Sequence, residues 1–355
     1  MRVFAGDTAD PTTFVQAVTV VKDKFGLTDL VMVGDRGMIT SARIDALRQH
    51  TELGWLTCLR APAIKMLAAD DGPLQMSLFD TQDLAEIVHP DYPGERLIAC
   101  RNPALAAERA RKRQDLLAAT QTLLAKVKSR VDGGGLSGQD SIGVAVGKVV
   151  DRYKMAKHFI IHIGQTSLTY QRDQARIDAE AALDGIYVIR TSVPAQTLDA
   201  AEVVTAYKSL SHVERDFRHI KTDDLALRPI HHRLEDRVRA HVLICMLAAY
   251  LVWHLRATLA PLTYTDTQPP EHANPVAPAQ RSTTAARKAS RHHDDHGQPV
   301  RSFRTLLAHL GTLTRNRIHI TDTNNGTAFD QLAEPTPTQR RAFELLNTPI
   351  PITLS

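Results

Sequence analysis

The sequence is poor in cysteine and aromatic residues and has no long apolar run. Its three cysteines are scattered among 355 residues without metal-site spacing, which favours a reducing compartment over a secreted, disulfide-stabilised domain. The longest apolar run, around 242–255, is interrupted by Tyr250, Trp253 and His254, so it falls short of the roughly 18 apolar residues of a membrane span. The first ten residues show neither the apolar core nor the cleavage site of a signal peptide, so we expect no export. We therefore expect a soluble, cytoplasmic protein without a membrane segment.

The remaining composition is that of an ordinary globular protein, with 43% hydrophobic and 23% charged residues, and the length predicts two or three domains. The net charge of +4 is unevenly distributed. Eight Lys and Arg stand against two acidic residues from Arg101 to Arg130, and six against two from Arg281 to Arg304. Such segments either contact nucleic acid or form solvated surfaces and linkers.

Strand and helix patterns alternate at the start of the chain. Residues 30–33 and 55–59 have the short apolar runs of buried strands, with helical patterns at 11–25 and 41–49. This alternation, which returns with a strand at 186–190, predicts an α/β core with parallel strands.

The regular alternation of strand and helix patterns stops between residues 61 and 185. Short strand patterns at 84–88, 96–100, 159–163 and 167–170 surround a long basic helix that Asn102-Pro103 opens and the glycines at 133–135 end, with Leu105, Leu116, Leu123 and Val127 facing inward. We therefore expect the core in 1–60 and 186–260, a mixed, largely β insertion in 61–185, a Pro- and His-rich linker in 261–300 and a small C-terminal segment in 301–355.

Two features could carry chemistry. Asp35 follows a buried strand, the place where ligands gather in α/β sheets, although Gly-Asp-Arg-Gly is also good turn chemistry. On a helix expected from about 199 to 221, Tyr207, Glu214 and Lys221 recur every seven residues along one face, and Arg218 lies near them.

A second stripe of that helix predicts its core-facing side, and it consists of Val203, Leu210, Val213, Phe217 and Ile220. The polar face combines a carboxylate with cations, which suits Mg²⁺ and a phosphodiester. A solvated face with an ordinary Glu–Arg pair would show the same pattern.

Three other patterns favour plain structural roles. The run from His292 to His296 is better explained as a solvated tract than as a metal site, His231-His232 as a loop feature, and the glycines at 133–135 as a connector without phosphate-loop spacing.

The spacing Tyr207-x2-Leu210-x3-Glu214-x6-Lys221 resembles the Tyr-Arg-Glu-Lys signature of DDE transposases in the insertion-sequence-four superfamily, with Leu210 in the place of the signature's Arg. The strand ending in Asp35-Arg36-Gly37-Met38 looks like that family's second-aspartate segment. The segments 228–233 and 237–241 are similar to the sixteen-thirty-four branch downstream of its catalytic Glu, and 6–10 resembles its Gly-Asn-x-x-Asp turn.

The resemblance implies a ribonuclease-H-like core interrupted by an insertion, and two Mg²⁺ or Mn²⁺ ions on a carboxylate triad that cleaves and transfers DNA strands. By position, Asp35 and Glu214 would be the second and third carboxylates and the metal ligands. Tyr207 and Lys221 would contact DNA phosphates, with help from Arg218. The partner would be insertion-sequence ends, bound by a homodimer.

The chain departs from the family at its start. The first catalytic Asp and the first strands would precede the turn at 6–10, so we expect an N-terminally truncated copy with an exposed sheet edge. Asp7 and Asp10 are not substitutes, because they fall in a turn and a helix cap. Two carboxylates bind two metals poorly, so we expect DNA binding without cleavage. The alternatives are a catalytically dead DNA-binding remnant or inhibitor of the full-length transposase and, more distantly, a nuclease of the same fold.

Overall fold

The computed structural model describes residues 4, 13, 18, 20–21, 24–27, 30–48, 53–69, 71–223, 225, 227–270, 274–294, 297–319 and 328–350. The chain divides into two compact units. The first comprises Ala9–Leu210 and Asn274–Pro278, and the second Met1–Thr8, Ser211–Ala273 and Ala279–Ser355. The expected turn at 6–10 lies outside the described residues. Of the expected helix at 11–25, the described residues include Thr13, Val18 and Val21, and these are helical.

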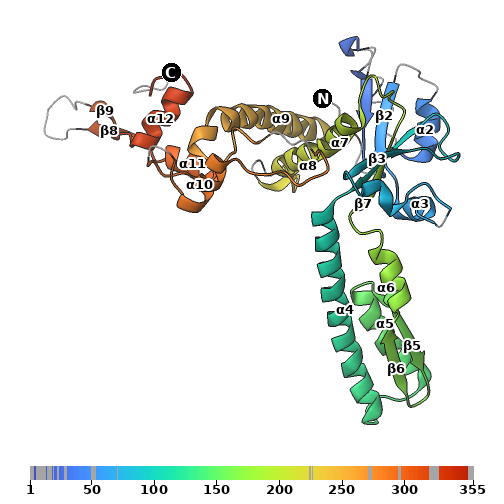
Figure 1. Cartoon of the computed structure of the whole chain (residues 1–355). Coiled ribbons are helices and arrows are strands. Elements are labelled where there is room, and N and C mark those ends of the chain that lie inside the picture. Colours follow the sequence, from blue (N-terminus) through green and yellow to red (C-terminus); the bar gives the residue numbers. More distant parts are fainter. Residues whose placement is uncertain are drawn as a thin grey trace. The chain divides into compact units, whose positions relative to one another are not determined.

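A five-stranded mixed sheet forms the centre of the first unit (Figure 1). The strands run in the order β1 (Leu30–Val33), β2 (Leu53–Cys58), β7 (Ile186–Thr191), β4 (Arg96–Arg101) and β3 (Leu84–Ile87). β1 and β2 are parallel, whereas β7 pairs antiparallel with both β2 and β4, and β3 with β4. The expectation of a parallel core is therefore wrong beyond β1 and β2. A short turn joins β3 to β4, and only antiparallel strands can be connected so directly.

Both faces of this sheet are buried. On one face, α2 (Ser41–Leu47) packs on Leu53 and Trp55, while α3 (Ala61–Leu67) and the 3-10 turn Met76–Phe79 cover Leu97, Ala99 and Val188. On the other face, α7 (Ala200–Lys208) buries Val203 and Val204 against the alternate strand residues Leu56, Ile98 and Ile189. Near-continuous apolar strands follow from this double coverage.

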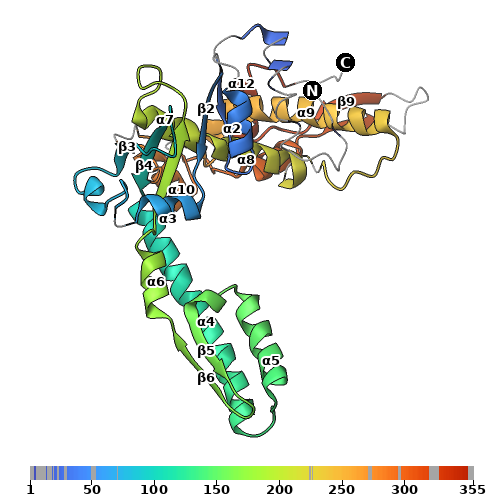
Figure 2. The ribbon, with the colours of Figure 1, turned by 90° about the vertical axis from the view of Figure 1, so that its right-hand side faces the viewer.

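A long excursion separates β4 from β7. It comprises α4 (Pro103–Asp132), α5 (Gln139–Arg152), the 3-10 turn Ala156–His158, the hairpin β5 (Phe159–Ile163) and β6 (Leu168–Arg172), and α6 (Gln174–Ala181). Figure 2 shows α4, α5 and the hairpin side by side, and they share a separate apolar core. The excursion leaves and returns at one point, where the Asn102 N–H donates to the Gly185 carbonyl at 2.9 Å.

Two expectations about this region need correction. β3 and β4 belong to the main sheet, so the separate segment begins at 102 and not at 61. It is also mostly helical and not largely β. The Asn102 side chain accepts a hydrogen bond from the Leu105 N–H and Pro103 occupies the first turn, as expected for this helix start. The inward side of α4 is carried by Leu117, Leu124 and Val127, whereas Leu116 packs only at the margin.

The second unit is built on helices. It contains most of α8 (Leu210–Arg218), the π-helical turn η3 (His219–Asp223), α9 (Glu235–Thr258), α10 (Thr283–Arg291), α11 (Phe303–Leu310), the hairpin β8 (Arg315–His319) and β9 (Ala328–Leu332), and α12 (Pro337–Leu345). The end of α9, α11 and α12 share a small core around Leu259, Phe303, Leu306 and Ala342.

The stretch 261–300, expected as a linker, is organised in its described part. Thr263 forms a β-bridge with Arg301. The Asp266 carboxylate accepts hydrogen bonds from the Ser282 N–H and hydroxyl at 2.7 Å each, and the Ser282 hydroxyl caps α10.

α9 is long and apolar enough to cross a membrane by length and composition, and 6% of its most apolar window is buried. The interrupted run at 242–255 thus lies in a helix that passes this simple test, contrary to our expectation from the sequence. One such helix is weak evidence for a membrane span.

Candidate functional site

Asp35 lies directly after β1, in a turn that fixes one of its carboxylate oxygens. Asp35 Oδ1 accepts hydrogen bonds from the backbone N–H groups of Gly37 at 2.8 Å and Met38 at 2.7 Å. The side chain is exposed, and neither bond uses Oδ2. Gly34 allows the turn to close, since a Cβ there would lie 2.8 Å from the Ile39 side chain. The turn role and the ligand role proposed for Asp35 are therefore compatible.

α7 places Tyr207 beside this turn. Burial raises the pKa of Tyr207, and the neighbouring Cys58 thiol and Asp35 carboxylate raise it further. Tyr207 therefore keeps its hydroxyl proton near pH 7, and its O–H can donate a hydrogen bond to an oxygen acceptor. Arg36 lies close enough to oppose this rise in the pKa of Tyr207. Among the residues proposed from sequence, Asp35 and Tyr207 are thus neighbours within one unit.

Tyr207 belongs to a cluster of two thiols and two phenols, with Cys58, Cys100 and Tyr187. The sequence analysis did not predict this cluster. Burial raises the pKa of Cys58 and raises that of Cys100 to about 12. Tyr187 lies beside Cys100, and burial raises its pKa as well. All four groups are neutral near pH 7, so the cluster adds no charge. The ends of β2 and β4 carry the two cysteines, a position that could have singled them out.

Hydrogen bonds also hold the side chain of Lys208, the last residue of α7. Its Nζ donates to the carbonyls of Val276 at 2.9 Å and Ala277 at 3.0 Å. Burial lowers the pKa of this amine. These bonds fix the end of α7, next to Tyr207, against the segment Asn274–Pro278.

The other three proposed residues lie in the second unit. Glu214 and Arg218 are exposed on α8, and Lys221 is exposed in η3 with its Nζ 5.5 Å from the centroid of the Phe217 ring. The single helix expected from 199 to 221 is interrupted at Ser209 and ends in π-helical geometry, so the seven-residue spacing does not follow one regular α-helix. Because the residues belong to different units, the approach of Glu214 to Asp35 stays a prediction.

The expected core stripe of this helix is only partly confirmed. Val203 is fully buried, whereas Val213 is 49% and Phe217 54% exposed. Leu210 and Ile220 are half-buried, so only complete burial along the stripe ends with α7.

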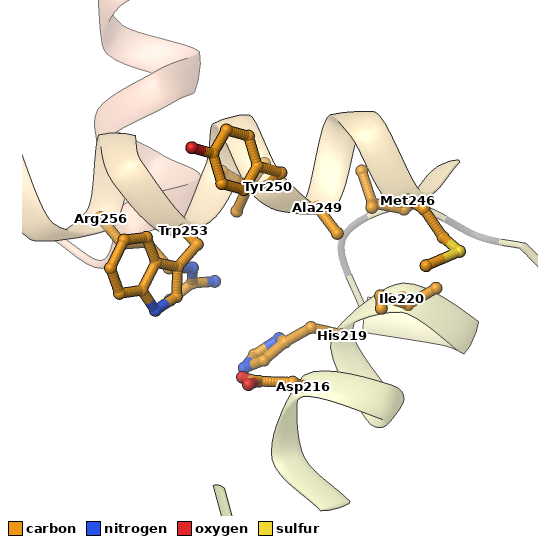
Figure 3. Close-up of a pocket in the computed structure, with 10 residues that line it drawn as sticks. Asp216, His219, Ile220, Met246, Ala249, Tyr250, Trp253 and Arg256 are labelled. Atoms are coloured by element: carbon orange, nitrogen blue, oxygen red, sulfur yellow. The ribbon is translucent and has the colours of Figure 1, made fainter. Parts of the chain in front are cut away.

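A cavity of about 310 Å³ lies within the second unit, between α9 and the end of α8 with η3 (Figure 3). Its walls are largely apolar, with Ile220, Met246 and Trp253 among them. Asp216 and His219 line one side and Arg256 the other. Glu214, Arg218 and Lys221 are not among the residues that line it.

The tract from His292 gives no metal site in its described part. His292 ends α10 and shares a 2.9 Å hydrogen bond with the Tyr264 hydroxyl, and Asp294 accepts from the Gln298 N–H at 2.7 Å. Throughout the described residues no group of three or more His, Cys, Asp or Glu could hold a metal ion. Asp295 and His296 lie outside that description.

Comparison with known families places the chain. The family model described as Transposase DDE domain matches residues 1–251, which is well over half of the 355 residues. The chain therefore belongs to the DDE transposase family, a family of DNA-transferring enzymes. No curated protein matches it. No solved structure matches it either.

Proposed function

We propose that this chain is a transposase polypeptide that acts on the DNA of an insertion sequence. The insertion sequence would belong to the sixteen-thirty-four branch of the insertion-sequence-four superfamily. The observation that carries the proposal is Asp35, exposed at the end of β1 beside a protonated Tyr207, in a chain that matches the DDE domain. The proposed core is ribonuclease-H-like, with 102–185 as its insertion. The proposed compartment is the cytoplasm and the proposed assembly a homodimer on DNA ends.

The carboxylate of Asp35 offers one oxygen ligand that suits a hard divalent cation. Asp35 Oδ2 is left over after the turn hydrogen bonds, and carboxylate oxygens are the ligands that Mg²⁺ and Mn²⁺ prefer. Asp35 and Glu214 would hold the metal. A pair of such ions supplies activation of the attacking hydroxyl and stabilisation of the leaving oxygen. Within the described residues no group of three or more His, Cys, Asp or Glu side chains could hold a metal ion.

The remaining proposed residues would position DNA. Tyr207 donates a neutral hydrogen bond, and the exposed cations Arg218 and Lys221 meet the charge of phosphate oxygens. Leu210 stands where the family signature has Arg, so Arg218 would supply a guanidinium from four residues beyond Glu214.

With two identified carboxylates, we expect the isolated chain to bind DNA without cutting it. Such a chain would compete with a complete transposase for the same ends. The purified protein should be incubated with element-end DNA and Mg²⁺ or Mn²⁺, next to Glu214→Ala and, as a matched control, Glu235→Ala. Glu235 is an exposed acid that pairs with Arg239 at the start of α9.

Retarded but intact DNA would support the proposal. Nicking by the parent that disappears in Glu214→Ala and persists in Glu235→Ala would show a competent enzyme and overturn the inactivity. No binding to any DNA would overturn the function itself.

A further inference from the structure

A basic surface outside the proposed catalytic residues covers part of the second unit. From Arg281 to His319 the sequence has eight Lys and Arg against two acidic residues. This stretch, which we name the basic module, contains α10, α11 and β8. It lies beyond residue 251, where the match to the DDE domain ends.

Most arginine side chains of the basic module face the solvent. The side chains of Arg281, Arg287, Arg291, Arg304 and Arg317 are exposed. Lys288, by contrast, is 8% exposed, and its Nζ donates to the Pro261 carbonyl at 3.4 Å. α10 therefore has an inner face that contacts the 3-10 turn Ala260–Leu262 after α9 and an outer face that carries guanidinium groups.

The loop between α10 and α11 brings the ends of these two helices, which carry arginines, close together. The Val300 N–H donates to the His292 carbonyl at 2.9 Å, and His293 bridges to Pro299. The end of α10, with Arg291, is thereby held against the start of α11, with Arg304. β8 follows α11 after four residues and extends the cationic stretch through Arg315 and Arg317.

Nearby carboxylates are occupied by the chain itself. Asp266 caps the start of α10 through Ser282, and Asp294 accepts from the Gln298 N–H. Asp330 lies 3.8 Å from Arg315. The hydrogen bonds hold Asp266 and Asp294 within the chain, and Asp330 offsets the charge of Arg315.

No Phe, Tyr or Trp side chain of the module is exposed. Phe303 is the only Phe, Tyr or Trp from 281 to 319; it is 8% exposed and lies under the Arg256 guanidinium at 4.4 Å. Unpaired bases bind by stacking on exposed aromatic rings, and membrane-surface helices insert aromatic and leucine side chains. Exposed cations without exposed Phe, Tyr or Trp rings instead suit the phosphate backbone of a duplex.

We propose that the basic module is a second duplex-DNA-binding surface, which grips the phosphate backbone without reading sequence and independently of Asp35 and Glu214. The inference rests on the proposed function only in that DNA is the substrate. Such a surface would hold flanking or target DNA while the DDE domain engages the ends.

The test is equilibrium binding of the full chain to a 30-base-pair duplex of arbitrary sequence, without metal, over a range of salt concentrations. The variant Arg291→Ser/Arg304→Ser/Arg317→Ser removes three exposed cations of the module. Its matched control, Lys154→Ser/Arg340→Ser/Arg341→Ser, removes three exposed cations that are paired with Asp151, Glu334 and Glu344. Circular dichroism establishes that both variants are folded.

The module variant should lose about tenfold or more in affinity near 0.1 M salt, and the slope of log K against log salt should fall by about 3. The control should stay within about twofold of the parent. Equal losses in both variants, or parental binding by the module variant, would overturn the proposal. So would a loss seen with single strands or phosphatidylserine vesicles but not with the duplex.

The proposed function is tested separately, because its readouts are element-end binding and metal-dependent nicking. Glu214→Ala should bind the arbitrary duplex like the parent. A clear loss of that binding in Glu214→Ala would overturn the independence of the two surfaces.

Discussion

At the scale of single residues, the buried Glu95 side chain forms an ion network that joins segments of the first unit that are far apart in the sequence. The Glu95 side chain is 1% exposed and accepts from Arg190 Nε at 2.6 Å and Arg48 Nη2 at 2.7 Å. The Arg190 guanidinium lies 5.4 Å from the centroid of Trp55 and 4.9 Å from that of Tyr92. Glu95 follows the turn glycine Gly94, so the sequence alone suggests only a turn residue.

Glu95→Gln should destabilise the protein by about 3 kcal/mol, because it leaves two guanidinium groups without their buried counter-charge. Chemical denaturation measures the change. Glu86→Gln is the matched control, since Glu86 is 39% exposed and pairs with Arg96, and it should cost at most about 1 kcal/mol. Equal losses in the two variants would contradict the importance of burial.

Tyr207→Phe should weaken element-end binding about three- to tenfold, since it removes a hydroxyl that is fully protonated and lies near Asp35. Tyr187→Phe makes the same chemical change beside Cys100, inside the same cluster, and should leave binding unchanged. Fluorescence anisotropy on labelled DNA distinguishes the two. Equal effects would mean that the cluster acts only through stability.

At the scale of elements, the excursion between β4 and β7 carries a buried histidine in the 3-10 turn Ala156–His158. His158 is 1% exposed, with its Nε2 3.2 Å from a Glu180 oxygen. Burial lowers the pKa of His158 below its ordinary value of about 6.5, and Glu180 opposes this only in part. Protonation therefore favours the unfolded chain.

Stability should accordingly fall as the pH drops below about 6.5, since the unfolded chain binds this proton more readily. His158→Gln should flatten the dependence between about pH 5 and 7, measured by thermal unfolding. His162→Gln changes an exposed histidine on β5 of the same hairpin and should keep the parental profile. An unchanged profile in His158→Gln would assign the pH dependence to other groups.

At the scale of the whole molecule, the excursion from 102 to 185 is a self-contained addition to the sheet. Its core residues, such as Leu117, Ile142 and Leu168, contact one another. Arg113 pairs with Asp184 within the same segment, and the two ends meet at the Asn102–Gly185 hydrogen bond.

Replacement of residues 103–184 by a short Gly-Ser linker should therefore leave the five-stranded sheet folded. The expected result is a cooperative unfolding transition followed by Trp55 fluorescence, because Trp55 is 1% exposed in that sheet. Trp253→Phe in the same background removes the other tryptophan signal. A non-cooperative transition would show that the sheet needs the excursion.

The sequence by itself determined what depends on neighbouring residues. The strand at 30–33, the Asn102 cap and the helix after it follow from local apolar runs and capping chemistry, and the structure confirms them. The Asp35 turn and the spacing of Tyr207, Glu214 and Lys221 also sufficed to identify a DDE transposase, which the match over 1–251 bears out.

Only the tertiary structure decided which strands pair, in which direction and around which side chains. The antiparallel pairing of Leu56 with Thr191 and the bond between Glu95 and Arg190 join residues far apart in the chain. Local propensity carries no information about such partners, because strand pairing and ion pairing depend on burial that the whole fold creates. For the same reason the sequence could not predict that Cys58 and Tyr207 lie next to each other beside Asp35.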